Sequence, residues 1–390
     1  MKASTISITA AVVALGMALQ PAAAADKLRL GFMSSMSGPI GSLGAEQRRG
    51  LDLALEELGG KIGGMDVDVL VGDDQGVPKA AVDAASQLIF KDKVDIITGV
   101  IASPALIGAS KTFIDSGRIV VSANAGPSNF AGKDCQANFF FTGFQNDQGD
   151  EAIGSYFNEH GIKRVFFIGF DNQAGYDHIN GAKRTYKGAI AGEAHTPLTQ
   201  LEYSAEIAQI RAAKPDAVFA FYVAAPAVAF VKQYSQAGLI KNIPLFSFAL
   251  VDPMSAKAQG QAAFGVKVAA PYFPQIDNPQ NKKFVATFVK KYGRVPSFYA
   301  ADQYDAIMLI DSAVKAVHGK VGDTSAMRAA LMKADFKSLR GKFSFNVNHF
   351  PIQDYYIATA VPAKTGVDFK IDGVLKDGKD AYYQECKMAQ

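Results

Sequence analysis

The stretch LRLGFM, residues 28–33, is short and apolar, and the stretch GAEQRRGLDLALEEL, residues 44–58, follows it closely. In the second stretch Leu51, Ala54 and Leu58 recur at the spacing of one helix face, whereas the first stretch is typical of a buried strand. The alternation then continues, with strands expected at 67–71, 95–99 and 119–121 and helices at 80–90 and 101–113. Such a rhythm predicts a doubly wound parallel sheet.

A second unit of the same kind begins after the apolar triplet 139–141. Helices are expected at 149–159 and 176–190, and strands at 165–169, 217–222 and 244–248. The tail adds helices expected at 282–292, 297–317 and 324–332, and strands near 342–346 and 355–361. No low-complexity linker separates the units, so the predicted fold is α/β with two Rossmann-like lobes joined by tight crossings.

The N-terminus has the pattern of a secretory signal peptide, predicted at residues 1–25. Lys2 precedes an apolar run at 6–19, and small residues lead to a cleavage point after Ala24 or Ala25. The run is too short for a transmembrane helix, which needs roughly 20 apolar residues. We therefore expect export to the periplasm as a soluble protein.

Composition and motifs exclude several functions. The chain has 40 Lys and Arg against 37 Asp and Glu, both signs interspersed, so it lacks the basic face of a nucleic-acid binder. It has no G-x-S-x-G elbow, no H-E-x-x-H helix, no Walker A loop and no G-x-G-x-x-G fingerprint. The five histidines lack metal-ligand spacing, and we predict surface positions for them: His160, His178, His195, His318 and His349. We expect neither an enzyme nor a metal or cofactor site.

Cys135 and Cys386 are the only cysteines. Export to an oxidising compartment allows them to pair, and we predict that disulfide. The alternative is two unrelated buried thiols.

Several segments, in order, resemble the branched-chain amino acid binding protein family, the type I periplasmic receptors of ABC importers. They are SSMSGP at 34–39, GDD at 72–74, GVIAS at 99–103, SANAGPS at 122–128, NQAG at 172–175, and Tyr299 with Tyr304-Asp305. The resemblance covers nearly the whole mature chain.

The resemblance implies a monomeric receptor whose ligand lies in a cleft between two lobes, and whose partner is the membrane permease of the transporter. The chain would cross between the lobes three times, near Gly143, Ala270 and Gln353, to give a three-stranded hinge. The implied lobes are residues 26–143 plus 271–353 and residues 144–270 plus 354–390. Open α/β sheets in general bind ligands at the carboxyl ends of their strands.

In this family the ligand carboxylate rests on a hydroxyl and on backbone N–H groups at loops that open helices. Ser103 matches the family serine and can cap the following helix, whose N-terminus favours an anion. Ala125 and Gly126 fall where relatives offer N–H groups, beside Asn124. The remaining predicted ligand residues are Ser37, Leu43, Gln145, Asn172, Gln173, Tyr222, Phe248 and Tyr272.

In the amino-acid binders of this family, acidic side chains hold the ammonium group of the ligand. This sequence lacks acids at the matching positions. Their positions fall at Phe248 and Gln145, and a buried ammonium without a carboxylate is costly. The segments 124–128 and 144–148 also resemble the subgroup that binds aromatic carboxylates. Together these features favour a benzoate-type or cinnamate-type ligand.

Three other functions stay open. A branched-chain amino acid receptor would need its acid displaced, to Asp147 or Asp252. A ligand-sensing domain would usually carry a membrane span and a signalling module, which the sequence does not show. A secreted enzyme would need a catalytic constellation.

Overall fold

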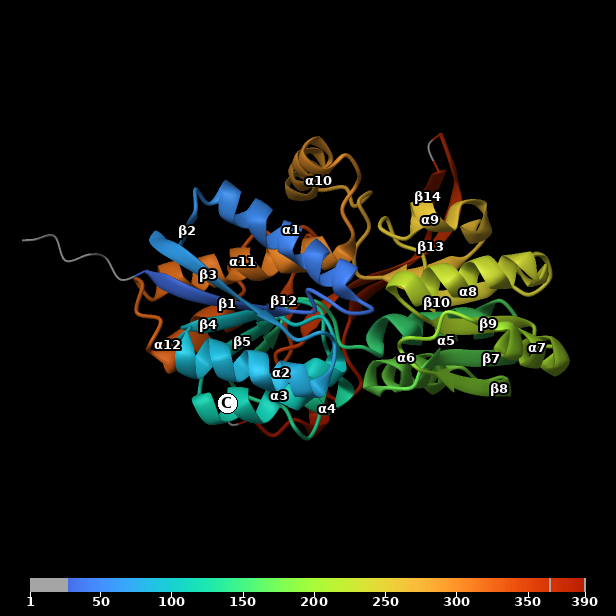
Figure 1. Cartoon of the computed structure of the whole chain (residues 1–390), viewed down its shortest axis with the longest axis horizontal. Coiled ribbons are helices and arrows are strands. Elements are labelled where there is room, and N and C mark those ends of the chain that lie inside the picture. The colour runs from blue at the N-terminus through green and yellow to red at the C-terminus, as the bar shows by residue number, and fades with distance from the viewer. Residues whose placement is uncertain (1–26, 365, 389–390) are drawn as a thin grey trace, which may run out of the picture.

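The structure is a computed structural model that describes residues 27–364 and 366–388. Figure 1 shows two α/β lobes lying end to end, each built around one sheet. The predicted α/β fold with two lobes is therefore confirmed. The predicted signal peptide, residues 1–25, lies outside the described residues. No helix of the described part is long and apolar enough to cross a bilayer.

The first lobe contains a six-stranded sheet in the order β2-β3-β1-β4-β5-β6, parallel except for the β2-β3 pair. Its central strands are nearly continuous apolar runs because helices cover both faces of the sheet. The strands are β1 (Leu28–Ser34), β2 (Lys61–Ile62), β3 (Met65–Asp73), β4 (Ile96–Gly99), β5 (Ile119–Ser122) and β6 (Phe139–Phe141).

The helices of this lobe cover the sheet from both sides, with α1 and α11 on one face and α2 and α3 on the other (Figure 1). Close packing of α1 on α11 requires Gly50, since a Cβ there would lie 2.1 Å from the Ala300 carbonyl oxygen. The helices are α1 (Gly41–Glu57), α2 (Pro78–Ser86), α3 (Ser103–Ser116), α4 (Ser128–Ala131), α10 (Pro279–Tyr292), α11 (Phe298–Ala316) and α12 (Thr324–Met332).

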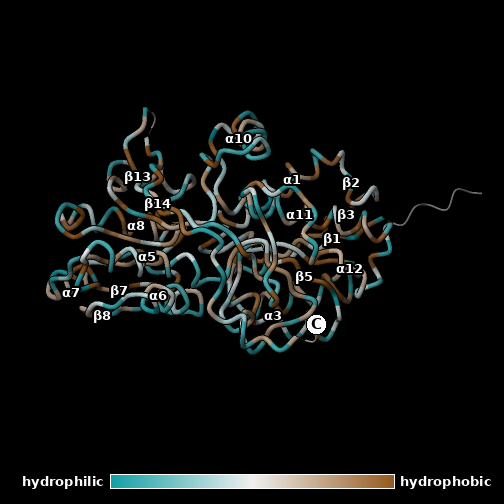
Figure 2. The backbone as a smooth tube through the Cα atoms, turned by 180° about the vertical axis from the view of Figure 1, so that it is seen from behind, coloured by the Kyte–Doolittle hydropathy of each residue, from teal (hydrophilic) through white to brown (hydrophobic). Residues whose placement is uncertain are grey.

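The second lobe contains an eight-stranded sheet in the order β12-β13-β11-β10-β9-β7-β8, with β14 pairing β13. Figure 2 shows the same two lobes from behind. The strands are β7 (Arg164–Phe170), β8 (Ala189–Thr196), β9 (Ala217–Phe221), β10 (Leu245–Phe248), β11 (Lys267–Ala270), β12 (Ser344–Phe345), β13 (Pro351–Ala363) and β14 (Gly366–Gly378). The helices are α5 (Gln148–Glu159), α6 (Gln173–Thr185), α7 (Ser204–Ala213), α8 (Ala224–Gln236) and α9 (Ala256–Gln259).

Three strands of this lobe, β8, β11 and β14, differ from the sequence prediction. The structure ends α6 at Thr185 and forms β8 at 189–196, where the sequence predicted a helix through 190. It also adds β14, which was not predicted, antiparallel to β13. The strands β8 and β14 lie at sheet edges and are largely solvent-accessible, so they lack the apolar runs by which the buried strands were recognised. The strand β11 was not predicted either; it is buried between β10 and β13 but is only four residues long.

Arg340 holds the crossing segments together. Its buried guanidinium donates to the carbonyls of Thr142 and Gly143 on the first crossing, and to Gln353 Oε1 at 2.6 Å on the third. It also pairs with Asp305 of α11 at 3.1 Å. One cation therefore ties two crossings to the helix beneath them.

Asp302 lies one turn before Asp305 on α11, and its burial disfavours the charged form of its carboxyl group. It lies 3.3 Å from Arg340 Nη1, yet neither of its buried oxygens has a hydrogen-bond partner among the described residues. Burial outweighs the attraction of Arg340 and raises the Asp302 pKa to about 8. Folding therefore takes up a proton here between pH ~4 and 8.

We predict that Asp302→Asn removes a pH-dependent loss of stability. A raised pKa in the folded state contributes stability at low pH that is lost as the pH rises toward about 8. Between pH 5 and pH 8 the wild-type free energy of unfolding should therefore fall more than that of the variant. Urea unfolding at both pH values measures this difference, with the exposed Asp83→Asn as control. Equal pH slopes in wild type and Asp302→Asn would contradict the prediction.

The predicted disulfide is confirmed: Cys135 and Cys386 are bonded, with Cα atoms 5.6 Å apart. The tail that follows β14 consequently returns to the first lobe. Asp380 accepts hydrogen bonds from the Asn348 side chain there, at 3.0 and 3.1 Å. The family resemblance assigned all of 354–390 to the second lobe, and these contacts join its last residues to residues 135 and 348.

Candidate functional site

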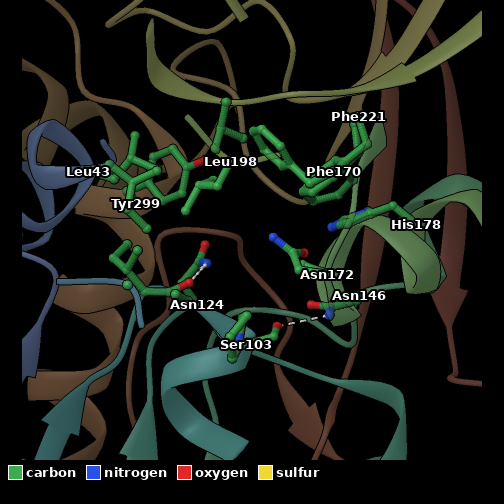
Figure 3. A pocket seen from close by; sticks show the side chains of 18 of the residues that line it. Leu43, Ser103, Asn124, Asn146, Phe170, Asn172, His178, Leu198, Phe221 and Tyr299 are labelled. Carbon is green, nitrogen blue, oxygen red and sulfur yellow. Dashed lines mark hydrogen bonds between the residues drawn. The ribbon is translucent and has the colours of Figure 1, made fainter. Parts of the chain in front are cut away.

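A cavity lies between the lobes, at the carboxyl ends of strands from both sheets (Figure 3). The space between its walls is about 570 Å³ when the open solvent at its mouth is counted. Its walls are mostly apolar: Ile40, Leu43, Ile101, Phe144, Phe170, Leu198, Phe221, Val223, Phe248 and Tyr299. Its polar side chains are Ser103, Asn124, Asn146, Asn172 and His178.

The first lobe contributes the N-terminus of α3 to the cavity. Ala102 is the N-cap residue and Ser103 the first helical residue, so Ser103 does not cap the helix as the sequence suggested. The amides of Ala105 and Leu106 donate to the Ala102 carbonyl, and Pro104 has no N–H. The Ser103 N–H lies at the positive end of the helix dipole and has no hydrogen-bond partner among the described residues, so it is available to an anion.

Asn146 sets the direction of the Ser103 hydroxyl. The Asn146 amide nitrogen donates to Ser103 Oγ at 3.0 Å and to Asp177 Oδ2 at 2.9 Å. Since Oγ already accepts one hydrogen bond, its own hydrogen is available to donate into the cavity. Asn146 was not among the predicted ligand residues, although it lies in the segment 144–148 that resembles the aromatic-acid subgroup.

Two asparagines present opposite ends of their amides to the cavity. Asn172 caps α6 by accepting from the Gly175 N–H at 3.1 Å, and its amide nitrogen points into the cavity (Figure 3). Asn124 donates to the Ile101 carbonyl at 2.7 Å, and its buried Oδ1 has no partner among the described residues. The cavity therefore offers a donor at Asn172 and an acceptor at Asn124.

His178 corrects the prediction that all histidines are surface residues, as does the buried His349. The His178 ring stacks on Phe221 with centroids 3.7 Å apart, and Nδ1 lies 2.5 Å from Asp150 Oδ2. Burial lowers the His178 pKa well below its usual value, and it raises the Asp150 pKa well above its own. The helices α5 and α6 bring this pair together from positions 28 residues apart in the sequence.

Aromatic rings form the wall contributed by the hinge and the second lobe. Phe248 packs against Phe144 with centroids 4.6 Å apart, and against the His178 ring at 4.8 Å. Phe170 meets Phe221 edge to face at 5.9 Å. Such a wall is suited to a flat apolar or aromatic group.

No Asp, Glu, Lys or Arg appears among the described residues that line the cavity. The carboxylate oxygens of Asp177, behind Asn146, already accept hydrogen bonds from protein groups. The donors are Ser128, Asn146 and Gln173. Burial raises the pKa of Asp177 to about 6. The lining thus holds hydrogen-bonding groups without a fixed carboxylate for a ligand ammonium.

Five of the predicted ligand residues line the cavity: Leu43, Ser103, Asn124, Asn172 and Phe248. The two predicted backbone donors beside Asn124 do not. The Ala125 N–H already donates to the Val100 carbonyl at 3.0 Å, so the prediction for Ala125 is not met. Gly126 packs against the first crossing, where a Cβ would lie 1.8 Å from the Phe144 carbonyl oxygen.

The other five predicted residues lie outside the lining and bond to protein groups instead. Gln145 bonds to Asp147, Gln173 to Asp177, Tyr222 to Thr196, Tyr272 to Asn281 and Ser37 to Asp73. Tyr222 and Tyr272 are core residues, as their burial shows. A single sequence does not reveal that their hydroxyls are already paired.

The family model for periplasmic binding proteins matches residues 27–366. The chain belongs to this periplasmic binding protein family. A solved solute-binding protein of an ABC transporter from R. palustris, in complex with benzoate, is 30% identical with a TM-score of 0.88, over 93% of this chain and 100% of that one.

Two further proteins are also similar to this chain. A solute-binding protein from Rhodopseudomonas palustris BisB5, in complex with 3,4-dihydroxybenzoic acid, is 26% identical with a TM-score of 0.84, over 91% of this chain and 99% of that one. The Leu/Ile/Val-binding protein homolog 6 of Brucella melitensis is 27% identical, over 88% of this chain and 90% of the relative. The chain is accordingly a solute-binding protein of an ABC transporter.

Proposed function

We propose that this solute-binding protein captures a small aromatic carboxylate, of the benzoate or cinnamate type, for uptake. One observation carries the proposal: hydrogen-bond donors and aromatic walls share a cavity whose described lining has no acidic side chain. Binding needs no chemical conversion of the ligand and no cofactor.

The carboxylate is assigned to the end of the cavity formed by α3. The Ser103 hydroxyl and N–H donate to it, and the helix N-terminus adds a favourable dipole. The aromatic ring then lies against the wall that contains Phe248 and Phe144. The complexes of the R. palustris proteins with benzoate and 3,4-dihydroxybenzoic acid support this class of ligand.

The rival proposal is an amino acid receptor, favoured by the names of the Brucella relatives and by the unpaired acceptor Asn124 Oδ1. An ammonium group would find that amide oxygen but no carboxylate in the described lining. A buried unpaired charge costs several kcal/mol, so the aromatic acid is preferred.

For the location and partner of the protein, we propose what the sequence predicted. We propose that residues 1–25 are removed on export, and that the mature protein acts in the periplasm as a monomer. Its partner would be the membrane permease of the same transporter. N-terminal sequencing of exported protein tests the first point, and a chain that began at Met1 would contradict it.

A thermal-shift screen tests the proposed function. Benzoate, 4-hydroxybenzoate and cinnamate at 100 times their Kd should each stabilise the protein by about 2.7 kcal/mol, which raises the Tm by mass action. Leucine, valine and phenylalanine should leave the Tm unchanged at the same concentration. Stabilisation by the amino acids alone would replace this proposal with its rival.

We predict that Ser103→Ala weakens binding of the aromatic acid by about 1.5 to 3 kcal/mol, because it removes a hydrogen bond to a charged group. Isothermal titration calorimetry measures the change in Kd. Ser110→Ala is the matched control, because Ser110 is on the same helix but bonds the Ile107 carbonyl outside the cavity. An unchanged Kd in Ser103→Ala would mean that the ligand carboxylate does not bind at the N-terminus of α3.

A further inference from the structure

Asp150 and His178 form a buried acid and base pair whose second ring nitrogen faces the cavity. Nδ1 of His178 is 2.5 Å from Asp150 Oδ2, and Figure 3 shows the outer ring nitrogen pointing toward the cavity. Both side chains are almost fully buried, at 2% and 0% exposure. The other Asp150 oxygen has no hydrogen-bond partner among the described residues.

Burial limits where the protons of this pair reside. When the pair carries two protons in all, either Asp150 is a neutral acid that donates to Nδ1, or it is a carboxylate beside an imidazolium. Both arrangements leave a hydrogen on Nε2 of His178. The third arrangement, a carboxylate beside a neutral ring with its hydrogen on Nδ1, leaves one uncompensated buried charge.

The surroundings disfavour that third arrangement. Asp147 and Glu151 add negative charge near Asp150. The nearby Arg184 pairs with those two acids, and no Lys or Arg bonds Asp150 among the described residues. The rings of Phe144, Phe221 and Phe248 contact the imidazole on its buried side, and Asp150 behind it is fully buried, so water does not compensate a charge on Asp150.

We propose that His178 is a specificity-determining residue whose Nε2–H donates to the ligand carboxylate, and that Asp150 is a positioning residue that keeps this hydrogen on Nε2. The inference rests on the proposed function and deepens it, because it explains how a cavity without Lys or Arg in its described lining selects an anion. The proton remains within the pair, so no proton needs to enter or leave when the ligand binds.

The test compares benzoate with benzamide, a neutral molecule of the same shape, by calorimetry. His178→Leu should weaken benzoate binding roughly 10- to 100-fold, as expected for one lost hydrogen bond to a charge, and benzamide binding much less. His178→Gln, whose side-chain amide retains a donor, should preserve most of the preference for benzoate. His349→Gln, at the other buried histidine, should change neither affinity.

Equal losses of benzoate and benzamide in His178→Leu would overturn the role of His178 and leave the proposed function standing. Failure of the wild type to bind benzoate would instead overturn the proposed function, and with it the ligand contact of His178. The proton assignment has its own readout: ¹⁵N spectra of the ligand-free protein should show His178 protonated at Nε2. A ring protonated at Nδ1 alone would overturn the role of Asp150.

Discussion

Phe248→Glu is expected to weaken binding of a benzoate-type acid by more than about 100-fold, the product of two effects. A buried phenyl ring is worth roughly 1.5 to 3 kcal/mol, and its loss removes a wall of the cavity. A second carboxylate ~6 Å from the first would repel it by ~3 kcal/mol at an effective dielectric constant of ~20. The Phe248 ring lies 4.8 Å from the His178 ring, so a new carboxylate would also compete with the ligand for that donor.

Calorimetry on the purified variant measures this loss. Phe248→Leu is the control, because it keeps an apolar wall and should retain binding within about tenfold, in line with a cost below ~1.5 kcal/mol for similar apolar volumes. Circular dichroism melts of both variants show whether they fold. A folded Phe248→Glu protein that binds benzoate like the wild type would place the ligand elsewhere.

Replacing both cysteines by serine is expected to lower the free energy of unfolding by roughly 5 kcal/mol, the entropic value for a very long closed loop. The bonded cysteines are 251 residues apart, so the bond restricts most of the unfolded chain. The tail also contacts the second lobe, where the Tyr382 hydroxyl donates to Asp147 at 2.7 Å and its ring lies under Arg184.

Guanidinium unfolding of the Cys135→Ser, Cys386→Ser double variant measures the effect. Wild-type protein unfolded in the presence of a reductant is the matched control and should lose a similar amount. If the double variant lost less than about 1 kcal/mol, the tail would be held by its other contacts, and the entropic account of the bond would be wrong for this protein.

The sequence predicted the elements whose signal is local. Buried strands such as β1 and β7 are continuous apolar runs, and amphipathic helices such as α1 show their spacing directly. Edge strands β8 and β14 have no such run, because one or both of their faces meet solvent. Their existence depends on a neighbouring strand, which a local pattern does not specify.

The resemblance to the family predicted three of the polar and aromatic lining residues, Ser103, Asn172 and Phe248. Position at a strand end was not sufficient by itself, because Tyr222 directly follows β9 and is a core residue. His178 was missed because its role depends on Asp150, which only the packing of α5 on α6 brings near. The Ala125 N–H was predicted to be free for a ligand. Its acceptor, the Val100 carbonyl, is 25 residues away in the sequence, and only the fold brings the two groups together.

Titration calorimetry of the mature wild-type protein with benzoate, and separately with leucine, tests the central claim most directly. We expect saturable heat with benzoate at one site per chain and no heat with leucine, because the described lining offers donors to a carboxylate and no acid to an ammonium. Saturable binding of leucine, with no heat from benzoate or any other aromatic acid, would contradict it.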